Sequence, residues 1–184
     1  MKMVKYAIAI AGLGVAVSSA QAQIVNGNFQ SGLTGWNPSG NVYASANDSP
    51  GTESAIFAAN MAANGQLSQT FTTIPGDFYS LNFNIGEFGA PTSQTLDVYL
   101  NGTLKWTPVS PVGSMPASIT AETFGFDATG TSTTLEFADV LGNNNVNSDL
   151  LLQNVSVRVP DGSSTSILCG MSLIGLGWLR RKLV

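Results

Sequence analysis

Three aromatic side chains, Trp36, Tyr99 and Trp106, are the residues of this sequence best suited to binding a sugar. A large exposed ring offers apolar area for the face of a sugar, and planar polar side chains beside it could hold the hydroxyl groups. Trp106 follows Lys105 and is the first candidate for such a platform. For Trp36 we favour packing in the core over exposure.

The acidic side chains raise two further possibilities. Asp139 and Asp149 flank an asparagine-rich stretch, and carboxylates are oxygen ligands that calcium prefers. Glu87, Glu122 and Glu136 are candidates for glycoside hydrolysis, which uses paired carboxylates about 5 Å or more apart. No local sequence distinguishes these glutamates, so we expect no catalytic residue and keep a hydrolase or lyase as the weaker alternative.

The residue types that are absent exclude several kinds of catalytic site. The chain contains no histidine, which excludes Ser-His-Asp triads, Cys-His pairs and zinc sites that use histidine. Its single cysteine, Cys169, cannot form a disulfide within the chain. Cys169 lies in an apolar stretch, where we interpret it as a small apolar residue, with lipidation after processing as the alternative.

The charge of residues 23–159 limits the partners. This region has two basic side chains, Lys105 and Arg158, and ten acidic ones, which gives a formal charge of −8. Nucleic acid is excluded as a partner because phosphate binding needs clustered lysine and arginine. Anionic membrane surfaces are disfavoured for the same reason.

The pattern of residues 23–159 predicts β structure, and we expect these residues to form one domain. Their spacing predicts a single jelly-roll-like antiparallel β-sandwich, an all-β fold. The predicted strands are rich in Thr, Val, Phe and Tyr: Gln66–Thr73, Phe78–Ile85, Thr95–Leu100, Leu104–Val109, Ile119–Asp127, Thr133–Ala138 and Leu150–Val159.

Within these strands, apolar and polar residues alternate, which indicates that one face of each strand is buried. Asn101-Gly102 predicts a type I′ hairpin turn, since both residues accept a positive φ. Ala55–Ala63 is the one stretch that could form a helical turn. The predicted core residues are Tyr79, Leu81, Phe83, Ile85, Leu96, Val98, Leu100, Val155, Val157 and Val159.

The N-terminal residues indicate export. Two lysines precede the apolar stretch Tyr6–Val17, and Ala20-Gln21-Ala22 forms an A-x-A site. This order is typical of a secretory signal peptide, so we expect the secretion translocon to act on the chain and cleavage to follow Ala22. Residues 1–22 are therefore assigned as the signal peptide, with an uncleaved anchor as the alternative.

The C-terminal residues 160–184 predict a second targeting signal, in addition to the signal peptide. The apolar run Ser166–Leu179 would form a helix of roughly 21 Å, against a hydrocarbon core of roughly 30 Å, which suits transient membrane insertion. The basic residues Arg180, Arg181 and Lys182 would stop the segment and stay cytoplasmic.

The short motif before this run is formed by Val159, Pro160, Asp161, Gly162, Ser164 and Thr165. It resembles the opening of PEP-CTERM sorting signals of the VPDSG-CTERM variant, from which Ser163 departs. The resemblance implies recognition by an exosortase, a membrane-embedded cysteine transpeptidase that cuts near the motif. An ordinary C-terminal membrane tail is the alternative.

A second resemblance covers most of residues 23–159. This region is similar to extracellular galactose-binding-like jelly-roll domains. The resemblance implies carbohydrate binding or a role as a cell-wall or matrix module. The matching segments are Ile24–Gln30 with Gly35-Trp36, Leu67–Phe71 with Pro75-Gly76 and Tyr79–Phe83, and Gln153–Val157.

Two departures from this second family affect its calcium site. Gln30 and Gln153 stand where the family usually has acids that help hold a structural calcium, and neutral amides supply oxygens but no charge. We therefore expect calcium to be weak or absent there and Gln30 and Gln153 to be hydrogen-bonded instead. Asp139 and Asp149 offer a looser alternative site, and no other cofactor is expected.

These features lead to one functional expectation and two alternatives. We expect an exported, exosortase-processed protein of the cell surface or extracellular matrix, held in the membrane by its C-terminal helix before processing. Its β-sandwich would be non-catalytic and structural, or associated with extracellular polysaccharide. A module with a defined glycan ligand is the second possibility, and a polysaccharide hydrolase or lyase is the third.

Overall fold

The computed structural model describes residues 23–46, 53–57, 64–89, 95–107, 118–140 and 148–159. The predicted signal peptide, the sorting motif from Pro160 onward and the predicted C-terminal helix lie outside these residues. Within the described ranges, no helix is long and apolar enough to cross a membrane. The strands are β1 (Asn37–Ser39), β2 (Val42–Ser45), β3 (Ser54–Phe57), β4 (Gln66–Thr72), β5 (Phe78–Gly89), β6 (Thr95–Leu100), β7 (Thr103–Trp106), β8 (Ser118–Asp127), β9 (Ser132–Val140) and β10 (Ser148–Arg158).

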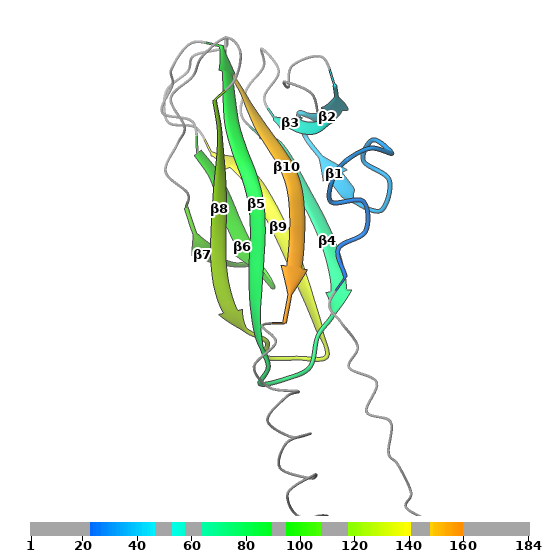
Figure 1. The fold of residues 1–184 in the computed structure, drawn as a ribbon, viewed down its shortest axis with the longest axis vertical. Helices are drawn as coiled ribbons and strands as arrows, with labels where there is room; N and C mark the ends of the chain where they lie inside the picture. Colours follow the sequence, from blue (N-terminus) through cyan, green and yellow to red (C-terminus); the bar gives the residue numbers. More distant parts are fainter. Residues whose placement is uncertain are drawn as a thin grey trace, which may run out of the picture.

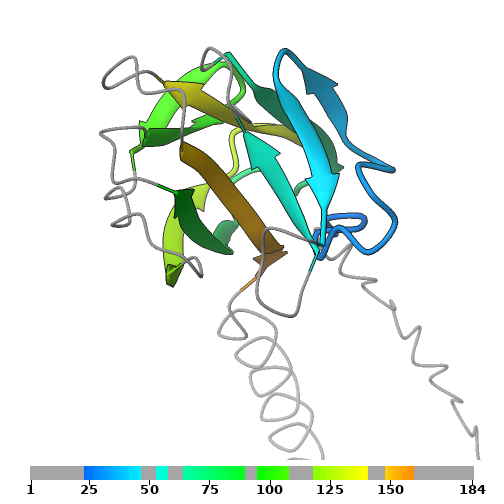
Figure 2. The ribbon, with the colours of Figure 1, turned by 90° about the horizontal axis from the view of Figure 1, so that it is seen from above.

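The strands form two antiparallel sheets of five that face each other as a sandwich (Figures 1 and 2). The first sheet has the order β1-β4-β9-β6-β7 and the second has the order β2-β3-β10-β5-β8. β4, β8 and β10 all end at the lower end of the sandwich in Figure 1. We call this the tail end, because Val159 follows β10 there. The prediction of an all-β sandwich is confirmed.

The alternating pattern identified β4 to β10 and the side of each strand that faces the core. Every predicted core residue is buried except Val159, which is partly buried and packs against the core. β5 and β9 extend beyond their predicted ends, to Gly89 and Val140. These extensions include a fully buried acid, Glu87, which interrupts the apolar alternation.

The first three strands were not predicted, and the suggested helical turn at Ala55–Ala63 is wrong for its first residues. Ala55, Ile56 and Phe57 belong to β3, where every residue is buried. A strand covered on both faces shows no alternation, so its short apolar run cannot be told from a buried helix by periodicity. Residues 58–63 lie outside the described ranges.

Aromatic rings form a continuous chain of contacts through the core. Adjacent rings have centroids 5.1–6.4 Å apart, within the range typical of aromatic pairs. The chain links strands of both sheets, so it sets how the sheets pack. In order, its members are Phe29, Trp36, Phe137, Phe83, Trp106, Phe124, Phe126 and Tyr79.

A buried amide ties the segment before β1 to the sandwich. The Oε1 of Gln69 accepts a hydrogen bond from the backbone N–H of Val25 at 2.7 Å, and its Nε2 donates to the carbonyls of Val25 and Gly35 at 3.0 and 2.8 Å. On the other side, Val155 donates its N–H to the carbonyl of Gly27. A Cβ on Gly27 would lie 1.9 Å from the Val155 carbonyl oxygen, so this contact requires glycine.

We expect Gln69→Leu to lower the free energy of unfolding by about 3 kcal/mol, because it removes three hydrogen bonds to partly buried backbone groups. Gln66→Leu is the matched control, since Gln66 is exposed on the same strand, and it should change stability by less than about 0.5 kcal/mol. Equilibrium urea unfolding of the exported protein measures both. Equal losses in the two variants would contradict the role assigned to Gln69.

Candidate functional site

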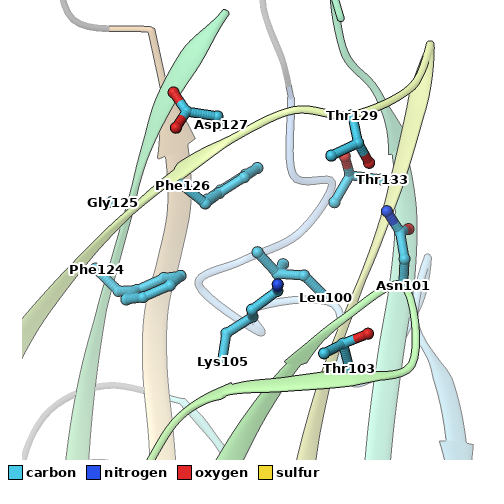
Figure 3. Close-up of a pocket in the computed structure, with 10 residues that line it drawn as sticks. All are labelled: Leu100, Asn101, Thr103, Lys105, Phe124, Gly125, Phe126, Asp127, Thr129 and Thr133. Carbon is cyan, nitrogen blue, oxygen red and sulfur yellow. The ribbon is translucent and has the colours of Figure 1, made fainter. Parts of the chain in front are cut away.

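An open cleft of about 460 Å³ lies at one side of the sandwich (Figure 3). Its lining comes mainly from β7 and β8, which are the edge strands of the two sheets on that side. Leu100 at the end of β6, Thr133 near the start of β9 and the adjoining turns complete it. Because no strand in the described part of the chain pairs β7 with β8, side chains that face the core can also reach the surface here. The volume falls within the range of roughly 300–1,000 Å³ of small-molecule sites.

The apolar wall of the cleft is formed by Leu100, Phe124 and Phe126. The ring planes of Phe124 and Phe126 are 13° apart in orientation, and their centroids are 6.4 Å apart. The ring planes of Phe124 and Trp106 differ by 15°, with centroids 6.2 Å apart. Near-parallel rings at such separations are offset rather than directly superposed. Phe126 is 8 % exposed and also stacks on Tyr79, so the partly exposed Phe124 supplies most of the ring surface that faces the cleft.

The turn between β6 and β7 forms one rim and fixes an amide donor. Asn101 and Gly102 have φ of 50° and 74°, which confirms the predicted positive-φ hairpin turn. The backbone N–H of Thr134 donates to the Oδ1 of Asn101 at 2.9 Å. Since an N–H can donate only to the oxygen of the amide, the orientation of Asn101 is determined, and its Nδ2 points toward the cleft (Figure 3).

Threonine hydroxyls hold the part of the rim next to Asn101 (Figure 3). The Oγ1 of Thr73 donates to the carbonyl of Gly130 at 2.8 Å, and lies 3.1 Å from the Oγ1 of Thr133. Because the one hydroxyl proton of Thr73 goes to Gly130, Thr133 is the donor in the second bond. The Oγ1 of Thr133 can still accept a hydrogen bond. The bond from Thr73 to Gly130 anchors the loop that carries Thr129 next to the cleft.

The cleft contains one cation and one carboxylate, Lys105 and Asp127. Both residues are exposed, and the ammonium end of Lys105 is directed toward the cleft (Figure 3). Lys105 is one of only two basic side chains in residues 23–159. Glycoside hydrolysis uses a pair of carboxylates, and the lining of this cleft supplies one.

The three aromatic candidates are not brought together on one platform. Trp36 is 5 % exposed, donates its Nε1–H to the carbonyl of Asn26 and contacts Phe29 and Phe137, so it lies in the core as favoured above. Its assignment as a sugar platform does not fit this burial.

Trp106 and Tyr99 point to opposite sides of the first sheet. Trp106 is opposite the buried Val98, is half-buried and packs on Phe83 and Phe124. Tyr99 is next to Val98 and therefore lies on the outer face, because successive strand residues alternate in direction. Trp106 supports the cleft from behind Phe124, while Tyr99 is placed away from it.

The candidate metal residues lie on different faces. Asp139 is opposite the buried Leu96 on the core side of the first sheet, while Asp149 precedes the core residue Leu150 and so lies on the outer face of the second. In the described residues, no group of three or more acidic or cysteine side chains could hold a metal ion. A calcium site at Asp139 and Asp149 stays a prediction.

Polar side chains on the outer face of the second sheet bond to one another. The Nε2 of Gln153 donates to the Oγ of Ser54 at 2.7 Å, so this side chain is hydrogen-bonded as expected. The Oγ1 of Thr123 donates to the Oδ1 of Asn82 at 2.9 Å. Gln30 is exposed. The cleft differs from this face because its amide and ammonium donors are directed into open space.

The cleft itself was not predicted from the sequence. It depends on β7 and β8 lying side by side as edge strands, which is a long-range arrangement. Two local signals were present: Lys105 follows the Asn101-Gly102 turn, and Phe124 and Phe126 alternate on one strand.

The overall fold is similar to that of carbohydrate-binding modules. A "Family 16 Carbohydrate Binding Module-2" aligns with 18 % identity over 73 % of this chain and 97 % of its own, with a TM-score of 0.52. A structure described as TmCBM61 in complex with beta-1,4-galactotriose aligns with 15 % identity over 74 % and 97 %, with a TM-score of 0.55. At these identities the likeness concerns the fold. No curated protein matches the sequence.

Two family models match the sequence. Residues 158–183 match the VPDSG-CTERM motif, which confirms the resemblance of the tail and marks the chain for export with a C-terminal sorting signal. Residues 16–158 match the model described as "Protein of unknown function (DUF642)". Since this second match covers most of the chain and nearly all of the sandwich, the protein belongs to the DUF642 family.

Proposed function

We propose that this protein is processed by an exosortase-type membrane transpeptidase and retained at the cell surface or in the extracellular matrix. The observation that carries the proposal is the VPDSG-CTERM match at residues 158–183, which begins where β10 ends at Arg158. The sorting sequence thus follows the last strand of the sandwich directly. Cleavage near the motif would release the folded domain without removing any strand.

Two earlier steps belong to the same proposal. The signal peptide, residues 1–22, brings the chain to the secretion translocon and is cleaved at Ala20-Gln21-Ala22. The apolar run then inserts transiently into the membrane, with Arg180, Arg181 and Lys182 on the cytoplasmic side. The domain stays membrane-held until the transpeptidase cuts.

At its destination, the sandwich acts as a non-catalytic module associated with extracellular polysaccharide. Its fold is similar to that of carbohydrate-binding modules, and its cleft combines an apolar wall with a few directed polar groups, as ligand sites do. The single carboxylate in the cleft favours binding over hydrolysis. A structural role in the matrix and a defined glycan ligand are both compatible with such a module.

Mass spectrometry of the exported protein tests the processing. We expect an N-terminus near Gln23 and the loss of Arg180–Val184. The signal peptide and the C-terminal sorting signal would both be removed because they direct export and are not part of the folded domain. Cells that lack the transpeptidase are the control, and they should accumulate the form with an intact C-terminus. An intact Arg180–Val184 end on surface material from normal cells would overturn this part of the proposal.

A polysaccharide panel tests the non-catalytic role. We expect the exported protein to be retained by at least one extracellular polysaccharide in affinity electrophoresis while releasing no reducing sugar from it, since the cleft lacks a second carboxylate. A known glycosidase serves as the positive control for the assay. Release of reducing sugar that persists after further purification would favour the hydrolase alternative.

A further inference from the structure

We propose that the cleft between β7 and β8 binds an acidic saccharide, and that Asn101 and Lys105 hold the carboxylate of a uronate unit. The inference rests on the proposed association with polysaccharide and adds the class of ligand and the residues that select it. It places the ligand at the open side of the sandwich, away from the outer faces of the two sheets.

The first support is a donor that is oriented before any ligand arrives. The Thr134 N–H donates a hydrogen bond to the Oδ1 of Asn101 at 2.9 Å, and the positive φ of Asn101 keeps this residue in the turn. The Nδ2 of Asn101 can therefore only donate. A fixed donor at the rim favours a ligand that presents acceptor oxygens.

The second support is the charge of Lys105. Its ammonium has three donors and no acceptor, and it reaches toward the same space as the Asn101 amide (Figure 3). Hydrogen bonds to charged groups contribute more than hydrogen bonds between neutral groups. A carboxylate placed between these donors would accept from both and balance the positive charge, which a neutral hydroxyl cannot do.

The acidity of the whole domain does not argue against an acidic ligand. Residues 23–159 carry a formal charge of −8, but charges farther apart than about 8 Å are largely screened at physiological ionic strength. The contact with Lys105 is local and acts inside that distance. Added salt would weaken the contact and relieve the general repulsion together, so substitutions distinguish the effects better than a salt series.

The remaining lining suits a sugar ring. Phe124, which is partly exposed, offers apolar area to the C–H groups of the ring, and the hydroxyls of Thr103 and Thr129 can each donate and accept. Asp127 follows the core residue Phe126 on β8, and its carboxylate is directed away from the other lining side chains (Figure 3). It therefore does not oppose the carboxylate of a ligand held by Asn101 and Lys105.

Isothermal titration calorimetry of the exported protein with oligogalacturonate and oligomannuronate tests the inference. Lys105→Gln should weaken binding about tenfold or more. Asn101→Asp should weaken it as well, because this variant keeps an oxygen for the Thr134 N–H and replaces the donor with a second carboxylate oxygen. Arg158→Gln is the matched control, since Arg158 is the only other basic residue of the domain and lies on β10; it should leave affinity unchanged.

The same oligosaccharides with their carboxylates reduced to alcohols are the ligand control, and they should lose most of the affinity. Equal binding of the acidic and reduced forms, or equal effects of Lys105→Gln and Arg158→Gln, would overturn the inference and leave the association with polysaccharide standing. Binding to no saccharide, acidic or neutral, would overturn both. Thermal unfolding of each variant shows whether a loss reflects folding, and Lys105→Arg should restore binding.

Discussion

The packing of aromatic rings across the core is the constraint on which the rest of this structure depends. The chain of contacts from Phe29 to Tyr79 passes from one sheet to the other and back. At Phe124 and Phe126 it reaches the side where, among the described strands, none joins the two sheets. The rings that hold the sheets together are therefore also the wall of the cleft, so the shape of the cleft follows from the core packing.

The parts of the fold that the sequence predicted are those that depend on local patterns. Alternation located Tyr79–Ile85 and its neighbouring strands, and Asn101-Gly102 located the turn between β6 and β7. β3 was missed because burial on both faces removes the alternation. The site was harder to predict, since the position of β7 next to β8 depends on strand order over long sequence separations. The burial favoured for Trp36 is confirmed by its contacts with Phe29 and Phe137.

The cleft and the sorting sequence are related by position. Because β6 and β8 end at the same end of the sandwich as β10, Leu100 and Asp127 lie toward the end from which the chain continues past Val159. The VPDSG-CTERM match marks the tail as a sorting signal, and the adjoining domain has a fold similar to that of carbohydrate-binding modules. In the proposed function, the tail would direct delivery and the cleft would present its donors to a saccharide.

The central claim is that the ligand lies in this cleft, and chemical-shift mapping by NMR tests it most directly. On titration with a short uronic acid oligosaccharide, the account predicts that the largest amide shifts cluster at Asn101–Lys105 and Phe124–Asp127. Shifts clustered instead on the outer face of the second sheet, around Asn82 and Gln153, would contradict it.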